Sequence, residues 1–240
     1  MCIFVVSNNE IPKEKELLQY LLDEFEKLNT EYKIKTIIKN INSKNTNVIL
    51  GNINEILYGD GCIFDRLGDY TFKISPMSFY QTNPIQTEVL YNKAIEYADL
   101  QKNDVLLDLY CGIGTIGIYA SKYVNKVYGI EIVEQAIIDA NENAKLNNID
   151  NIEFKCGDVE KVLDNLLKEK NIKPSVIMVD PPRRGLDNHT IETILKVKPE
   201  KVVYISCNPA TMVRDLNKME EMYNIIKIQP VDMFPFSRTC

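Results

Sequence analysis

The residues best suited to covalent chemistry lie late in the chain, where the apolar run Val203-Tyr204-Ile205 leads into Ser206-Cys207-Asn208-Pro209. A thiol between a strand and a following helix can form a thiolate that the helix dipole stabilises. Such a thiolate can add to C6 of uracil, which makes C5 nucleophilic enough to attack a methyl donor. A base must then remove the C5 proton so that the thiol can leave. An isolated cysteine here would be a buried structural residue, so the assignment of Cys207 as nucleophile depends on its surroundings.

A second reactive segment, Val179-Asp180-Pro181-Pro182-Arg183, ends the preceding apolar run. Asp-Pro-Pro after a strand is typical of methyltransferases that act on nucleobases or amide-like nitrogens, since two prolines stiffen the backbone that presents Asp180. This segment alone also suits an amine methyltransferase that forms no covalent bond. Loss of the Cys207 thiol would abolish activity in the uracil mechanism and leave an amine methyltransferase nearly intact.

A glycine-rich turn lies after the strand expected at Val105–Leu109 and opens a helix; it reads Asp108-Leu-Tyr110-Cys-Gly112-Ile-Gly114-Thr-Ile-Gly117. The G-x-G-x-x-G spacing, with Glu131 about 20 residues later, fits the NAD fingerprint. Asp108 favours a second interpretation, because Rossmann-like methyltransferases carry Asp-x-x-x-Gly-x-Gly at this turn. An NAD-dependent oxidoreductase therefore stays an alternative to an S-adenosylmethionine-dependent methyltransferase.

In the methyltransferase interpretation, each acidic residue at a strand end has a place around the cofactor. Gly112 and Gly114 let the backbone approach S-adenosylmethionine, and Glu131 holds the ribose hydroxyls. Asp158, after the strand ending in Cys156-Gly157, faces the adenine edge. The contrasting interpretation makes Asp108 a helix cap and Glu131 a surface charge.

The composition sets limits on the class of protein. A chain of 240 residues with 45% hydrophobic residues is globular, and no apolar run is long enough to span a membrane. The start has no secretory signal, so we expect a cytoplasmic protein. The six cysteines have no C-x-x-C spacing, so we expect neither a metal site nor an iron–sulfur cluster. The net charge of −6 disfavours nucleic-acid binding, although the last third of the chain carries Arg183, Arg184, Arg214 and Arg238.

Alternating strand and helix patterns fill the chain from Pro84 onward. Strands are expected at 105–109, 126–130, 152–156, 175–179, 201–206 and 223–231, and helices at 86–97, 116–123, 133–146, 159–169, 187–196 and 210–221. This order predicts an α/β fold, a Rossmann-like, doubly wound and mostly parallel sheet whose ligands bind at the carboxyl ends of the strands.

The first part of the chain predicts a small α+β unit. A strand is expected at 2–7, a helix at 12–28 and a strand at 32–41, followed by short strands at 55–58, 62–67 and 70–74 that form hairpins at Gly59-Asp60-Gly61 and Gly68-Asp69. We therefore divide the chain into this unit at 1–78 and a catalytic domain at 79–240.

Five ordered motifs resemble the RNA 5-methyluridine methyltransferase family over the region from about Ile53 to the last residue. They are Ser78–Pro84 (Ser-Phe-Tyr-Gln-Thr-Asn-Pro), Asp108–Gly114, Asp180–Gly185, Ser206–Pro209 and Gln229–Pro235. The family methylates uridines in 23S ribosomal RNA or in the T-loop of transfer RNA. The resemblance implies RNA as the substrate, for which we expect 23S ribosomal RNA rather than transfer RNA.

The resemblance also assigns roles to residues. It implies that Gln81, Tyr110, Glu131 and Asp180 contact the cofactor and that Cys207 is the nucleophile. Arg183 and Asn208, which adjoin Asp180 and Cys207, are the candidate RNA contacts. The lone histidine, His189, we interpret as a surface residue.

Two departures from the family pattern accompany this resemblance. Family members usually begin with a β-barrel that binds RNA, and their catalytic base is a glutamate in a His-x-Glu motif just after the segment matching Phe234–Cys240. We expect the chain to be a fragment that binds S-adenosylmethionine and turns over poorly, which a comparison with a chain extended past Cys240 would test. An RNA-binding remnant without activity is the non-enzymatic alternative.

Overall fold

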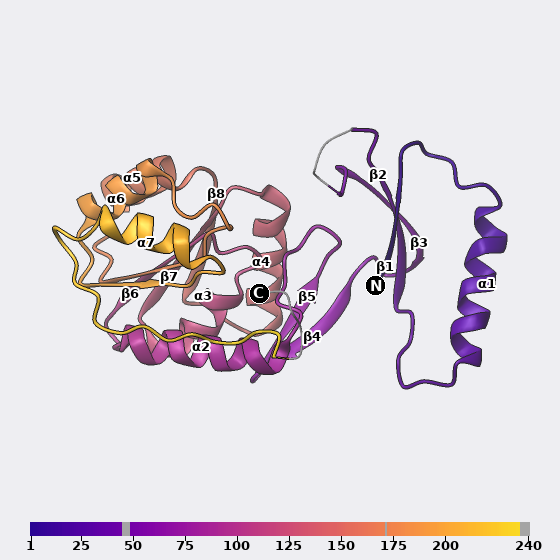
Figure 1. Cartoon of the computed structure of the whole chain (residues 1–240), viewed down its shortest axis with the longest axis horizontal. Coiled ribbons are helices and arrows are strands. Elements are labelled where there is room, and N and C mark those ends of the chain that lie inside the picture. The colour runs from indigo at the N-terminus through magenta and orange to yellow at the C-terminus, as the bar shows by residue number, and fades with distance from the viewer. Residues whose placement is uncertain (45–48, 171, 236–240) are drawn as a thin grey trace. The chain divides into compact units, whose positions relative to one another are not determined.

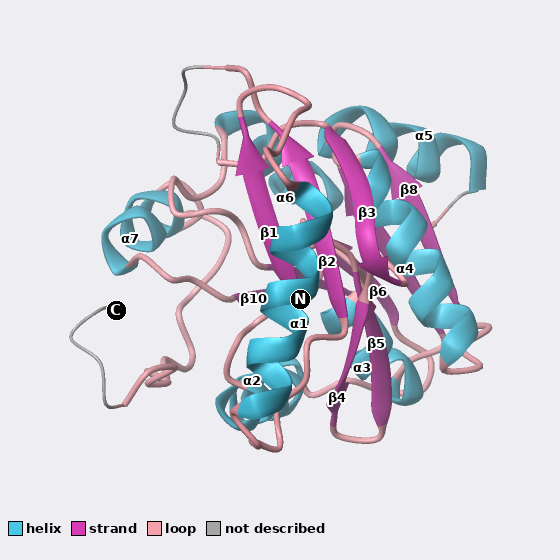
Figure 2. Ribbon diagram, turned by 90° about the vertical axis from the view of Figure 1, so that its right-hand side faces the viewer, coloured by secondary structure: helices cyan, strands magenta, loops and turns pink. Residues whose placement is uncertain are grey.

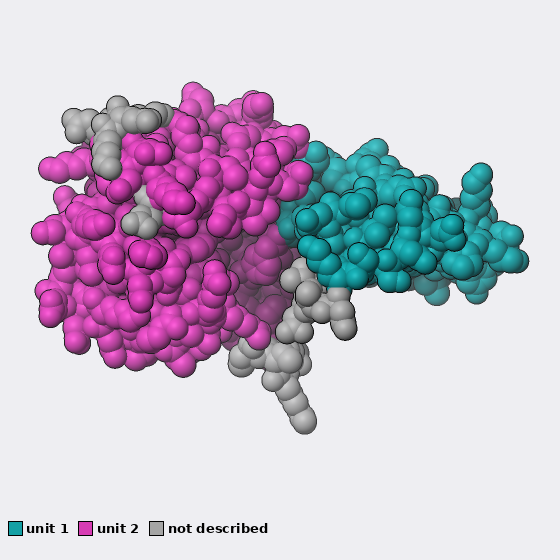
Figure 3. Space-filling model, turned by 90° about the horizontal axis from the view of Figure 1, so that it is seen from above, with its two compact units in different colours: residues 1–65, 73–78 teal, residues 66–72, 79–240 magenta. Residues whose placement is uncertain are grey.

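The computed structural model of the chain describes residues 1–44, 49–170 and 172–235 (Figure 1). Its chain forms two compact units (Figure 3). Unit 1 comprises Met1–Asp65 and Lys73–Ser78, and unit 2 comprises Arg66–Phe72 and Phe79–Cys240. No helix among the described residues has the length and apolar character that crossing a membrane requires.

Unit 1 is built on a three-stranded sheet in the order β1-β2-β3. β1 (Cys2–Val6) runs parallel to β2 (Thr36–Ile41) because α1 (Glu14–Lys27) lies between them in sequence. β3 (Ile53–Gly59) runs antiparallel to β2. The buried ammonium of Lys39 is held by Glu14 at 3.1 Å and by Glu55 at 2.8 Å, which ties the start of α1 and β3 to the central strand.

One of the two expected hairpins is present. β4 (Ile63–Leu67) and β5 (Tyr70–Ile74) form a two-stranded sheet around Gly68-Asp69. The hairpin expected at Gly59-Asp60-Gly61 was wrong, because β3 pairs with β2 instead. This turn closes against the start of β2: the N–H of Gly61 donates to Oγ1 of Thr36 at 3.0 Å, and a Cβ on Gly59 would lie 2.1 Å from the carbonyl oxygen of Lys35.

Unit 2 confirms the predicted α/β class. Its strands are β6 (Val105–Leu109), β7 (Lys126–Glu131), β8 (Ile152–Cys156), β9 (Val176–Val179) and β10 (Lys201–Tyr204). They form one sheet in the order β10-β9-β6-β7-β8, and all four pairings are parallel. β6 and β9 are the neighbours between which the strand order reverses, and ligands of doubly wound sheets bind at that point.

Helices cover both faces of this sheet, as Figures 1 and 2 show. One apolar core lies under α2 (Pro84–Ala98), α3 (Thr115–Ala120) with the short 3-10 helix Ser121–Tyr123, and α4 (Glu134–Leu146). The other lies under α5 (Val159–Lys170) and α6 (Asn188–Val197) and includes Met219, just past α7 (Pro209–Asn217). The central strands are therefore buried on both sides, which explains their mainly apolar sequences.

The strand expected at Tyr223–Val231 was wrong. The segment is extended but pairs with no strand among the described residues, and Ile225, Ile226 and Ile228 are exposed. Pro230 also lacks the N–H that a ladder requires. Its apolar pattern resembles that of a strand, yet a strand is stabilised only by a partner.

Candidate active site

The reactive residues predicted from the sequence come to one edge of the sheet of unit 2. Leu109 pairs with Ile130 of β7 and with Val179 of β9, and Val179 pairs with Tyr204 of β10. Tyr110, Glu131, Asp180 and Cys207 follow these paired positions by one to three residues. The carboxyl ends of four adjacent parallel strands thus bring the glycine-rich turn, two acids and a thiol to the same edge.

The glycine-rich turn after β6 adopts a conformation that favours glycine. Tyr110, Gly112 and Gly114 have φ angles of 64°, 54° and 82°. A Cβ on Gly112 would meet nothing within 4 Å, whereas a Cβ on Gly114 would lie 2.5 Å from the ring of Phe154. Gly114 therefore allows close packing behind the turn, and Gly112 leaves open space in front of it.

The carboxylate of Glu131 lies against this turn. One oxygen accepts from the N–H of Gly112 at 3.3 Å, and the other accepts from the N–H groups of Ile132 at 2.8 Å and Val133 at 3.0 Å. Half-buried at the end of β7, the carboxylate is fixed by backbone donors. These three bonds leave a lone pair on Oε2 with which the carboxylate can accept from a hydroxyl.

Asp108 lies beneath the turn and is fully buried. Its Oδ2 accepts from the N–H of Gly117 in α3 at 2.8 Å, and its Oδ1 has no hydrogen-bond partner among the described residues. Burial raises the pKa of Asp108 to about 8, and the nearby charges of Asp180 and Glu131 act in the same direction. Burial also raises the pKa of Asp180 to about 6.

The other cofactor candidates come from three separate segments of unit 2. The Tyr110 hydroxyl lies 3.0 Å from Oγ1 of Thr190 in α6, so its ring is directed toward that helix. Asp158 is exposed, one residue past Gly157 at the end of β8. Gln81 is half-buried two residues before Asn83, which caps α2 by accepting from the N–H of Gln86. These placements leave the cofactor roles of the three residues as predictions.

Two of the family-like motifs meet although they are far apart in sequence. Nδ2 of Asn83 donates to the carbonyl oxygen of Met233 at 2.9 Å. Asn83 belongs to the motif Ser78–Pro84, and Met233 belongs to Gln229–Pro235. The cap of α2 therefore also anchors the last described segment of the chain.

Cys207 is exposed, so its interpretation as a buried structural cysteine was wrong. It directly precedes Asn208, the N-cap of α7, whose side chain accepts from the N–H of Ala210 at 3.1 Å. Nδ2 of Asn208 also donates to the carbonyl oxygen of Arg183 at 3.2 Å. Asn208 therefore holds the loop of Cys207 in place, and both its contact with RNA and the role of Cys207 as nucleophile stay predictions.

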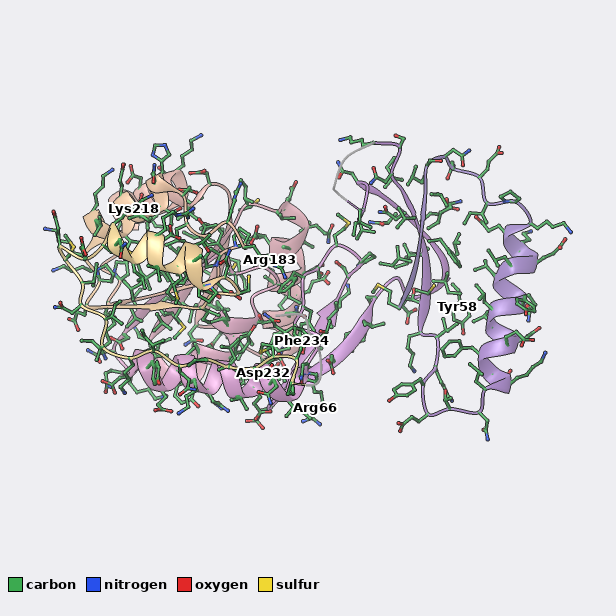
Figure 4. The ribbon with its side chains drawn as sticks, in the orientation of Figure 1. Tyr58, Arg66, Arg183, Lys218, Asp232 and Phe234 are labelled. Atoms are coloured by element: carbon green, nitrogen blue, oxygen red, sulfur yellow. The ribbon has the colours of Figure 1, made fainter. Side chains whose placement is uncertain are left out.

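The basic residues of the last third differ in their surroundings. Arg183 and Arg184 are exposed in the loop after β9, and Figure 4 shows Arg183 at the end of α7 opposite Lys218. Arg214 forms an ion pair with Asp215 at 2.6 Å. Arg238 lies outside the described residues. The exposed surface of His189 agrees with our interpretation of that residue.

Two features of the site were not found from the sequence. Tyr91 of α2 is buried with its hydroxyl 2.9 Å from Oγ1 of Thr115. Burial raises the pKa of Tyr91, and the charges of Asp180 and Asp108 act in the same direction. Asp215 is fully buried within α7. The available signal for Asp215 was its helical spacing from the apolar residues Met212, Leu216 and Met219, which places an acid on the inward side of α7.

Within the described part of the chain, no group of His, Cys, Asp and Glu could hold a metal ion.

Comparisons with known proteins agree with this geometry. A crystal structure of Pyrococcus abyssi tRNA (uracil-54, C5)-methyltransferase in complex with S-adenosyl-L-homocysteine matches 97% of this chain and 52% of its own, with 30% identity and a TM-score of 0.73. The Trm5b structure from the same organism matches at 14% identity with a TM-score of 0.57, which shows a shared fold alone.

Curated relatives match over almost the whole chain. An uncharacterized RNA methyltransferase of Oceanobacillus iheyensis is 44% identical over 236 residues, and one of Clostridium tetani is 47% identical over 235 residues. Each alignment covers 98% of this chain and 50% of the relative, so the chain spans about half the length of the curated relatives it matches. The family model described as tRNA (Uracil-5-)-methyltransferase matches residues 14–239, and the chain belongs to that family.

Proposed function

We propose that this protein transfers a methyl group from S-adenosylmethionine to C5 of a uridine in RNA through a covalent bond between Cys207 and C6. The observation that carries the proposal is the exposed Cys207 at the sheet edge where the glycine-rich turn, Glu131 and Asp180 also lie. A thiol so exposed has no packing role, and its neighbours are those that a nucleotide-like cofactor requires.

The residues at this edge fit S-adenosylmethionine, which supplies an activated methyl group. The open space before Gly112 admits the cofactor, and the fixed carboxylate of Glu131 holds the ribose by accepting from one of its hydroxyls. Asp108 shapes the turn from beneath, since its one bonded oxygen holds the start of α3. Further contacts in this proposal come from Gln81, Tyr110, Gly114, Asp158 and Asp180.

The proposed chemistry on the base proceeds in three steps. The Cys207 thiolate adds to C6, and the electron pair of the C5–C6 double bond moves toward C5 and the C4 carbonyl. C5 then takes the methyl group, and the electron pair of the broken methyl–sulfur bond stays on sulfur, which yields S-adenosylhomocysteine. A base removes the C5 proton, the released electron pair restores the double bond, and the thiolate leaves. Asp180 follows the strand adjacent to the one that leads to Cys207, and its pKa is raised to about 6, so it is suited to hydrogen-bond the uracil while this occurs.

RNA recognition in this proposal begins at the exposed loop after β9. Arg183 is placed to pair with a phosphate next to the target, because its guanidinium is at the surface while its carbonyl is held by Asn208. The target base must leave its stack to reach Cys207. We keep 23S ribosomal RNA as the predicted substrate, with transfer RNA, the substrate in the names of the family model and the Pyrococcus abyssi enzyme, as the second candidate.

RNA carrying 5-fluorouridine tests the covalent step directly. Fluorine cannot leave C5 as a cation, so methyl transfer leaves the Cys207–C6 bond intact and a protein–RNA band that survives denaturation. We expect this band with S-adenosylmethionine for the wild type and for the control Cys62→Ser, and no band for Cys207→Ala. A band from Cys207→Ala, or none from the wild type, would overturn the proposal. Parallel reactions with 23S ribosomal RNA and transfer RNA transcripts compare the two substrates.

The remaining alternatives predict other outcomes. An amine methyltransferase would methylate RNA equally well after Cys207→Ala. An NAD-dependent oxidoreductase would be stabilised against heat by NAD, whereas we expect stabilisation by S-adenosylhomocysteine only. An RNA-binding remnant would bind RNA and show no stabilisation by either ligand.

A further inference from the structure

The loops that carry Asp180 and Cys207 leave adjacent strands, and the strands alone do not hold them together. The last backbone hydrogen bond at this edge joins the N–H of Ile205 to the carbonyl oxygen of Val179 at 2.9 Å. Beyond it no backbone hydrogen bond between described residues joins the loop of Arg183 to the segment that leads into α7. Any fixed spacing between them must come from side chains.

A first set of side-chain contacts joins the two loops at one carbonyl group. The carbonyl oxygen of Arg183 accepts from Nδ2 of Asn208 at 3.2 Å and lies 3.2 Å from Oγ1 of Thr211. Both donors belong to the first turn of α7 or its cap. These contacts are partly exposed, so they alone are weak restraints.

A second set of contacts centres on Asp215, whose side chain is fully buried in the middle of this region. Oδ2 of Asp215 accepts from the N–H of Leu186 at 2.7 Å and from the Tyr204 hydroxyl at 2.8 Å. Oδ1 accepts from Nε and Nη2 of Arg214 at 2.8 and 2.6 Å. A single carboxylate thereby binds the loop after β9, the end of β10 and α7.

Arg214 extends this network to the loop backbone. Its Nη2 also donates to the carbonyl oxygens of Arg184 at 2.8 Å and of Leu186 at 3.2 Å. The planar guanidinium can serve the carboxylate and these carbonyls at once, which a lysine could not do. Arg214 is thus a bridge between Asp215 and the loop of Asp180 rather than a free cation for RNA.

The close approach of the loop to this network explains the glycine at its centre. Gly185 has a φ of +77°, and a Cβ there would lie 2.4 Å from Oδ2 of Asp215 and 2.7 Å from Nη2 of Arg214. Burying a carboxylate costs free energy unless hydrogen-bond donors compensate for the lost water. A buried carboxylate with four donors is therefore a specific restraint on the position of this loop.

We infer that Asp215 and Arg214 are positioning residues for methyl transfer, which fix the loop of Asp180 and Arg183 against the helix that follows Cys207. The inference rests on the proposed function. Asp215 touches neither cofactor nor base in this arrangement. Asp215 acts through the distance between the Cys207 thiol and the loop of Asp180. A displacement of about 1 Å between reacting groups can slow a reaction about 100-fold.

The test compares Asp215→Asn and Arg214→Lys with the wild type and with Glu220→Gln, an exposed control just past α7. The rate of adduct formation on 5-fluorouridine RNA is measured at saturating RNA and S-adenosylmethionine, and the affinity for S-adenosylhomocysteine is measured by calorimetry. We expect the adduct rate to fall about 10- to 100-fold in both variants, with the affinity within twofold of wild type. If Asp215→Asn folds poorly, Arg214→Lys provides the test. The side chain of Arg214 is partly exposed and lysine keeps the positive charge, so this substitution should be tolerated.

The outcomes separate this inference from the proposed function. Normal adduct rates in folded Asp215→Asn and Arg214→Lys overturn the inference and leave the proposed function standing. Equal losses of adduct rate and cofactor affinity also overturn it, since they indicate a general structural role. A wild type that binds S-adenosylhomocysteine but forms no adduct refutes the proposed function, and the inference with it.

Discussion

The N–H of Gly117 donates a hydrogen bond of 2.8 Å to Oδ2 of Asp108, while Oδ1 of the same carboxyl group is buried without a hydrogen-bond partner among the described residues. Because burial disfavours the charged form, the pKa of Asp108 is raised to about 8 and the carboxyl group retains its proton. The acid beneath the glycine-rich turn is thus largely neutral at pH 7 before cofactor binds.

This relationship predicts how stability depends on pH. An unfolded aspartate loses its proton near pH 4, whereas folded Asp108 keeps it to about pH 8. Between these values the folded state binds more protons, so the free energy of unfolding falls as pH rises, by at most about 1.4 kcal/mol per pH unit. Asp180, with its pKa raised to about 6, adds a loss in the same direction.

Asp108→Asn should remove most of this dependence, because an amide does not titrate. We expect the ligand-free wild type to lose more of its melting temperature than Asp108→Asn between pH 5 and pH 8.5, with exposed Asp60→Asn behaving as wild type. The measurement is a thermal melt at each pH. Parallel losses in Asp108→Asn and wild type would show that Asp108 is ionised in the folded protein.

Glu131→Gln should weaken cofactor binding without unfolding the protein. The carboxylate accepts from three backbone N–H groups, and glutamine keeps its size but loses its charge and one acceptor. A hydrogen bond to a charged group contributes about 1.5–3 kcal/mol, so we expect about 10- to 100-fold weaker binding of S-adenosylhomocysteine by calorimetry. Glu134→Gln, an exposed neighbour in α4, is the control, and an unchanged affinity in Glu131→Gln would remove Glu131 from the site.

Much of the sheet and the order of the site residues could be predicted from the sequence. The bounds of β6 were right because a strand at the centre of the sheet is mainly apolar between polar flanks. Those of β8, at the edge of the sheet, were right because its apolar residues alternate with charged ones. The shared edge of Glu131, Asp180 and Cys207 followed from parallel topology alone, since every parallel strand ends at the same side of its sheet.

Other features depend on contacts that no local pattern contains. The partners of Asp215 are a backbone N–H in another loop and a hydroxyl at the end of β10, which meet only after the sheet has formed. The apolar residues of Tyr223–Val231 fit a strand, yet the described structure offers them no pairing strand. Likewise, Gly59 and Gly61 correctly predicted a turn after β3. They did not predict that β3 pairs with β2.

Asn83→Ala should destabilise unit 2 and release the segment near Met233. The side chain caps α2 by accepting from Gln86 and donates to the carbonyl oxygen of Met233. Loss of an N-cap costs about 1 kcal/mol, and hydrogen exchange around Met233 should become faster. Asn83→Asp keeps the acceptor for the cap but removes the amide donor, so we expect it to restore stability while exchange near Met233 stays fast. Slow exchange in both variants would mean that other contacts hold this segment.

Alanine at Gly114 and at Gly112 separates backbone strain from packing in the glycine-rich turn. Both residues have positive φ, so both substitutions carry a conformational penalty of about 1 kcal/mol. Only the Cβ at position 114 would also collide with the ring of Phe154, at 2.5 Å, because the Cβ at position 112 meets nothing within 4 Å. We expect urea denaturation of the ligand-free protein to show a further loss of about 1–3 kcal/mol for Gly114→Ala relative to Gly112→Ala. Equal losses would mean that Phe154 moves aside without cost, and that packing behind the turn does not determine the glycine.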